Sequence, residues 1–98
     1  MTYVMQEHRT DEGRLLAACD ADIVGETFTE GETQLILDAE FYGTDEVELL
    51  DVLDALEGIA TANFAGERLV GELVDAEIIE ADEIKHVDGV PHVQLFFI

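Results

Sequence analysis

The sequence predicts a small α+β domain in which a mostly antiparallel sheet packs against two helices. Three observations predict it: strand-like segments near both ends of the chain, two segments with apolar residues at helical spacing between them, and turn residues at the junctions. The chain has 98 residues and shows no internal repeat, low-complexity segment or linker. We therefore expect residues 1–98 to form a single domain.

The first part of the chain predicts a hairpin and a third strand. Residues 3–9 and 14–19 are strand-like and flank a turn that contains Gly13. We expect the Asp20 side chain to cap a short helical turn that follows it. Residues 33–41 alternate apolar and polar side chains and predict the third strand.

The middle of the chain predicts the two helices. We expect the first to open at Thr44 or Asp45, where acidic residues favour the positive end of the helix dipole, and to end at or be interrupted by Gly58. Its apolar residues recur at helical spacing: Leu49, Leu50, Leu53 and Leu56. We expect the second helix to start near Thr61 or Asn63 and to bury the apolar pairs between residues 69 and 74.

The end of the chain predicts a second hairpin. Residues 84–87 and 90–98 are strand-like, and the Asp88–Gly89 pair between them is a strong hairpin turn signal. The last four residues are apolar on both faces of the predicted strand. Either both faces are covered within the chain, or one face meets a second subunit, so a homodimer is one expectation.

The charge of the chain points to a very salty cytoplasm. There are 24 acidic residues against 4 Lys plus Arg, for a net charge of −20, yet 48% of residues are hydrophobic, unlike a disordered acidic chain. Repulsion among such charges is strong at 0.01 M salt, where the Debye length is about 30 Å, and nearly vanishes at 1 M, where it is about 3 Å. We therefore expect a halophilic archaeon as the source.

Several classes of function are disfavoured by the composition. The first eight residues lack the basic start and apolar run of a signal peptide, and no segment reaches the roughly 20 apolar residues of a membrane helix. With one cysteine there is no internal disulfide. The presence of only four basic residues disfavours direct nucleic-acid binding, which relies on Lys and Arg to neutralise phosphates. No phosphate loop is present, and we expect a cytoplasmic protein without a cofactor.

Two weak patterns would serve catalysis or metal binding. Cys19, His92 and Asn63 are the residue types of a thiol hydrolase, in which the imidazole deprotonates the thiol. Cys19 with His86 and His92 could instead bind a metal ion, although the close ligand pairs of zinc sites are missing. Packing of Cys19 in the core is the simpler reading, since a buried free cysteine behaves as a small apolar side chain.

Non-acidic polar residues concentrate in two segments, which we take as the candidate binding site. The first holds Asn63 and Arg68 together with Gly66 and Glu67, and there the amides of a helix start could receive an anion beside the arginine. A structural reading of the same residues, as a cap and an ion pair, stays open. The second segment holds His92 and Gln94, which point the same way in a strand, although that face could simply be the solvent side.

Four stretches together resemble the archaeal family called domain of unknown function 424. They are residues 19–20 leading to 25–28 (Gly-Glu-Thr-Phe), 41–43 (Phe-Tyr-Gly), 62–68 (Ala-Asn-Phe-Ala-Gly-Glu-Arg) and 89–94 (Gly-Val-Pro-His-Val-Gln). They run in order over nearly the whole chain. The chain departs from the family pattern at Glu26, where relatives carry a basic residue, which fits adaptation to salt. The resemblance implies archaeal origin and a link to translation, but it does not point to any particular activity.

These observations favour a non-enzymatic binding module with a protein or ribonucleoprotein partner, linked to translation or ribosome biogenesis. The alternative is a small hydrolase or metal-binding protein that uses Cys19 and His92.

Overall fold

A computed structural model describes residues 2–97 of the chain. Within that range the strands are β1 (Tyr3–Thr10), β2 (Gly13–Asp20), β3 (Thr27–Glu30), β4 (Thr33–Ile36), β5 (Glu46–Val47), β6 (Thr61–Ala65), β7 (Lys85–Val87) and β8 (Val90–Phe96). The helices are α1 (Ala39–Tyr42), α2 (Leu49–Ala55) and α3 (Glu67–Asp75), with a 3₁₀ turn η1 at Ala81–Glu83. The predicted α+β class is confirmed.

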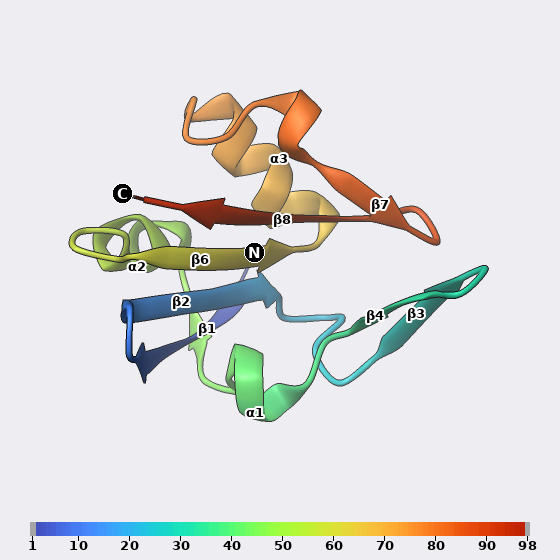
Figure 1. Ribbon diagram of the computed structural model, residues 1–98, viewed down its shortest axis with the longest axis horizontal. Helices are drawn as coiled ribbons and strands as arrows, with labels where there is room; N and C mark the ends of the chain where they lie inside the picture. Colours follow the sequence, from blue (N-terminus) through green and yellow to red (C-terminus); the bar gives the residue numbers. More distant parts are fainter. Residues whose placement is uncertain (1, 98) are drawn as a thin grey trace.

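A six-stranded sheet, counted over residues 2–97, forms the centre of the molecule in the order β5-β1-β2-β6-β8-β7. Its pairings are antiparallel except for that of β2 with β6, which is parallel. The mostly antiparallel sheet is therefore also confirmed. β3 and β4 form a separate two-stranded hairpin, the arm, which projects from the body and brings its tip beside the β7–β8 turn (Figure 1).

Two apolar clusters hold the two faces of the sheet. On one face, Leu16 and Phe64 pack with Val52 of α2 and with Leu69 and Leu73 of α3. On the other face, Cys19 and Ala65 pack with α1 and with the base of the arm. Because β2 and β6 contribute to both clusters, they are buried on both sides and read as nearly continuous apolar runs.

The predicted hairpins at both ends of the chain are confirmed. β1 pairs with β2 in the register Thr10 opposite Gly13. At the other end, β7 pairs with β8 around a turn in which Asp88 and Gly89 have φ of 52° and 80°. Two successive positive φ values define the turn that suits the twist of a two-residue hairpin.

The predicted position of the second helix is wrong at its start. Residues 61–65 form strand β6, and α3 begins only at Glu67. Ala62 and Phe64 face one cluster while Ala65 faces the other, so the period of this stretch is two. Its apolar and neutral character reflects burial on both faces, which a helix start does not require.

The predicted start of the first helix is also wrong. β5 occupies Glu46–Val47, and α2 begins at Leu49. Glu48 and Asp51 form a capping box at the start of α2, in which Oδ2 of Asp51 accepts a hydrogen bond from the Glu48 amide at 2.9 Å. Leu50 is 71% exposed and takes no part in the core.

The strand predicted over residues 33–41 is shorter than expected. It ends at Ile36, and the next residues form α1, where the Asp38 carboxylate accepts from the Glu40 amide at 2.9 Å. The capping side chain competes with extension of the strand, as aspartate commonly does at helix starts.

Candidate functional site

The candidate residues fall into two neighbouring groups. Asn63, His92 and Gln94 lie on one face of the sheet, because Asn63 is paired with Gln94 and Ala65 with His92 across β6 and β8. Gly66, Glu67 and Arg68 lie where β6 ends and α3 begins. The strand–helix junction therefore begins at Gly66, directly after the end of β6, the strand that carries Asn63 on the sheet face.

Asp20 organises the junction. Its side chain is only 5% exposed, and its Oδ1 and Oδ2 accept hydrogen bonds from the amides of Leu69 (2.8 Å) and Arg68 (3.0 Å). The expectation that Asp20 caps the turn directly after it is wrong, since its carboxylate caps α3 instead. The α3 amides at these two positions are thus engaged by a carboxylate of the chain itself.

Gly66 is fixed by the same contact. Its φ is 108°, and a Cβ built on it would collide with the Asp20 carboxylate. Both the backbone conformation and the carboxylate therefore require glycine at this position. Because Gly66 has no side chain, the Asp20 carboxylate can reach the first amides of α3.

Burial raises the pKa of Asp20, while the two backbone N–H donors and the Arg68 charge act in the opposite direction. The neighbouring Asp22 adds to the increase. The group is held by well-placed donors, yet its charged form is disfavoured by loss of water.

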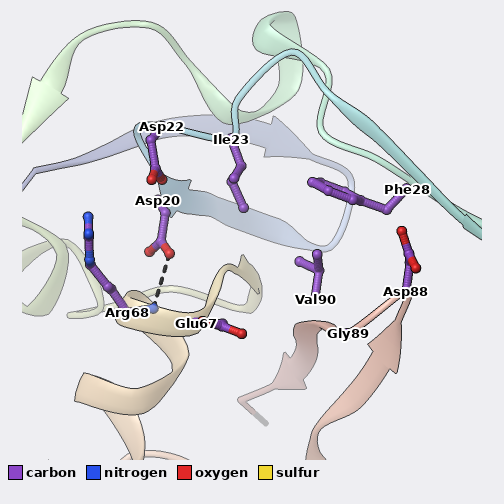
Figure 2. Close-up of a pocket in the computed structure, with 9 residues that line it drawn as sticks. All are labelled: Asp20, Asp22, Ile23, Phe28, Glu67, Arg68, Asp88, Gly89 and Val90. Carbon is purple, nitrogen blue, oxygen red and sulfur yellow. Dashed lines mark hydrogen bonds between the residues drawn. The ribbon is translucent and has the colours of Figure 1, made fainter.

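A cavity of about 320 Å³, the arm pocket, opens between this junction, the arm and the β7–β8 turn. Ile23, Phe28 and Val90 point toward one another and form its apolar wall (Figure 2). Its charged and polar lining consists of Asp20, Asp22, Glu67, Arg68, Asp88 and Gly89. Four carboxylates thus surround an apolar wall, with one guanidinium among them.

Hydrogen bonds between distant segments hold the pocket together. Glu30 at the end of β3 accepts from the Asp88 amide at 2.8 Å, which joins the arm to the β7–β8 turn. The Gly66 amide donates to the carbonyl of Pro91 at 2.9 Å, which joins the junction to β8. The pocket is therefore built from four parts of the chain and is shaped before any ligand arrives.

Cys19 does not line this pocket: it is fully buried in the apolar cluster behind the pocket wall of Ile23, Phe28 and Val90. Burial raises the pKa of its thiol to about 12. Burial, followed by the charges of Lys85 and His86, lowers the pKa of His92. Cys19 is paired with Ala65, and Ala65 with His92, so one strand separates the thiol from the imidazole.

Among residues 2–97 no group of three or more His, Cys, Asp or Glu side chains is placed to hold a metal ion. None of the helices formed by those residues has the length and apolar character needed to cross a membrane.

Comparison with known proteins places the chain in a family. Residues 7–98 match the family described as "Protein of unknown function (DUF424)". The chain belongs to the DUF424 family. It is also similar to the crystal structure of an uncharacterized conserved protein from Methanopyrus kandleri, with 27% identity, a TM-score of 0.79, and coverage of 98% of this chain and 91% of that one. A search of curated proteins found no match.

Three of the four stretches that carry the sequence resemblance to DUF424 proteins meet at the arm pocket. Asp20 and Phe28 come from the first of the four stretches, Arg68 from the third and Val90 from the fourth, and all four residues line the cavity. Chain segments that are up to about seventy residues apart are thus brought together by the fold.

Part of this lining was predictable from the sequence, and the rest was not. Glu67 and Arg68 were predicted, whereas Asp22, Phe28 and Asp88 were not. The acids were indistinguishable from the many acids of the surface. Phe28 carried a usable signal, because it is a large apolar residue between polar neighbours in a short strand.

Proposed function

We propose that this protein is a non-enzymatic binding module of a salt-adapted archaeal cytoplasm, and that the arm pocket holds a basic side chain of a protein partner. The observation that carries the proposal is the combined lining of the pocket: an apolar wall of Ile23, Phe28 and Val90 with carboxylates around it. An arginine or lysine side chain has the matching structure, an apolar stem with a charged end.

The chemistry of the pocket favours arginine over lysine. A guanidinium group can stack on an aromatic ring such as that of Phe28 while donating to carboxylates on either side. Asp22 and Glu67 are exposed and line the same cavity as Phe28, so they can receive it without a change of fold. Arg68 already lies beside Asp20 there.

Molar salt makes the shape of the pocket essential to such a function. At about 3 Å Debye length, the general attraction of an acidic surface for a basic partner is screened. Selectivity then depends on groups in direct contact, which a preformed pocket provides and an open acidic face does not.

A partner in translation or ribosome biogenesis fits this chemistry. Proteins that contact RNA carry exposed Lys and Arg, because they neutralise phosphates. The acidic module would bind such a protein rather than the nucleic acid itself. The sheet face of Asn63, His92 and Gln94 lies on the neighbouring strands and would extend the contact.

The test is a titration of ¹⁵N-labelled protein in 2 M KCl with acetyl-L-arginine methylamide, followed by NMR. We expect saturable shifts of the amide signals at the arm pocket, centred on Asp22, Phe28 and Asp88. The neutral isostere acetyl-L-citrulline methylamide serves as the control ligand. Phe28→Leu and Asp22→Asn are expected to weaken binding, and Asp54→Asn on α2 is the matched control.

Equal shifts with citrulline, or shifts spread evenly over the acidic surface, would contradict the proposal. A partner that requires Cys19 is not part of it, because that thiol is buried in the apolar cluster beneath α1.

A further inference from the structure

A second cavity adjoins the arm pocket. The α3 groove, about 420 Å³ in volume, runs between α3 and the segment from η1 to β8. Glu67 and Gly89 line both the groove and the arm pocket, so the two cavities are adjacent. The floor of the groove is apolar and includes Val70, Val74 and Ile84.

Gly71 in this groove has no explanation within the described part of the chain. It lies inside α3 and is exposed, and a Cβ added to it would meet no atom within 4 Å. The other glycines between residues 2 and 97 all have positive φ, whereas Gly71 does not. A glycine in the middle of a helix is destabilising relative to alanine. Neither a close neighbour nor a positive φ requires glycine at this position.

What Gly71 does provide is a low place on the helix surface. With no side chain there, the backbone of another molecule can lie directly against α3, between Val70 and Val74. The edges of the groove carry Glu67 and Asp75, with His86 across from them. An occupant with apolar and basic side chains matches both the floor and the edges.

We propose that the α3 groove receives the backbone of the same partner segment whose basic side chain enters the arm pocket. This inference rests on the proposed function, and it adds that the partner presents an arginine next to apolar residues in one continuous stretch. A second copy of this chain fits less well, because with 4 Lys plus Arg against 24 acidic residues it has few basic side chains to place in direct contact with Glu67 and Asp75.

The test uses a phage-displayed library of nine-residue peptides with a fixed central arginine, selected against the wild-type protein in 2 M KCl. Selected peptides are synthesised, and their affinities are measured for wild type, Gly71→Leu and Glu72→Leu. The first change fills the groove. The second places the same side chain on α3 at an exposed position that does not line the groove.

We expect Gly71→Leu to weaken binding at least ten-fold and Glu72→Leu to change it less than two-fold. Leucine is a better helix former than glycine, so the first variant is expected to fold, which circular dichroism checks. Equal affinities for Gly71→Leu and wild type would overturn the groove.

The two proposals fail separately. Peptides that need their arginine, lose affinity with Phe28→Leu and ignore Gly71→Leu would support the arm pocket alone. Peptides that bind equally well with citrulline in place of arginine would overturn the arm pocket. A selection that yields no arginine-dependent binder would count against both.

Discussion

Asp20 shows how one side chain can connect two distant parts of a fold. Its carboxylate accepts from amides 48 and 49 residues further along the chain, so β2 and the start of α3 are held together directly. Hydrogen bonds to a charged group contribute about 1.5–3 kcal/mol, and loss of a cap costs about 0.5–2 kcal/mol.

Asp20→Ala is therefore expected to lower the free energy of unfolding by about 2 kcal/mol. The measurement is urea denaturation in 2 M KCl. Asp22→Ala is the matched control, because that exposed side chain makes no such contact, and its effect should stay within about 0.5 kcal/mol. Equal effects of the two changes would contradict the role given to Asp20.

Gly66 and Gly71 make a second comparison at the level of single residues. Gly66→Ala places a Cβ against the Asp20 carboxylate at a φ of 108°, and should destabilise the protein by about 1–3 kcal/mol. Gly71→Ala meets open space on a helix and should stabilise it by about 0.5–1 kcal/mol. Thermal unfolding of both variants gives the two signs, and the same sign for both would refute the comparison.

The thiol of Cys19 is expected to be unreactive in the native state. Burial raises its pKa from the usual 9.0 to about 12, so almost no thiolate forms at pH 8. Because the pKa is higher in the folded than in the unfolded state, this group also lowers stability as the pH rises from about 9 toward 12. Iodoacetamide labelling at pH 8 should be slow in buffer and rapid in urea; fast labelling of the native protein would contradict the burial.

Within the described part of the chain, the outer edge of β8 is unpaired beyond His92. Phe97 donates its amide to Ala60, so alternate residues of β8 direct their backbone groups to β6, and Gln94 and Phe96 direct theirs outward. β7 begins at Lys85, opposite His92, so it does not pair with Gln94 or Phe96. Residues 89–98 form the longest run without Asp or Glu, and Phe96 is 64% exposed.

We propose that two copies of the chain pair along this edge when salt screens their charges. A neutral strand edge is the surface at which two such acidic molecules repel least. Light scattering in 2 M KCl is expected to give a dimer mass for wild type and a monomer mass for Phe96→Asp. Leu50→Asp, at an equally exposed apolar residue on α2, is the control, and a monomeric wild type would end the idea.

The strands and turns show which elements can be predicted from the residue pattern and which cannot. Both terminal hairpins could be predicted because their turns require particular residues, such as Asp88 and Gly89. β6 could not, since a strand buried on both faces loses the alternation that distinguishes it from a helix. The candidate site was found only in part for a related reason: Glu67 and Arg68 stood out by sequence, whereas Asp22 and Asp88 matter only through the place where the fold puts them.

The stability of the whole molecule is expected to increase with salt concentration. Its net charge of −20 on an accessible surface of 5985 Å² produces repulsion that falls steeply as the Debye length shortens. The melting temperature should rise between 0.1 M and 2 M KCl. A variant in which exposed acids such as Asp11, Glu32 and Asp54 are replaced by lysine should show a smaller rise, and a higher melting temperature in dilute buffer would contradict this reading.

The parallel pairing of β2 with β6 sets the order in which the molecule can fold. The two strands are separated in sequence by the arm, α1, β5 and α2, so their contact closes a long loop, whereas each terminal hairpin closes a short one. The hairpins can form early, but α3 obtains its Asp20 cap only after that long closure. Folding should therefore be limited by one late step, and the amides of Arg68 and Leu69 should exchange their hydrogens only when the whole domain opens.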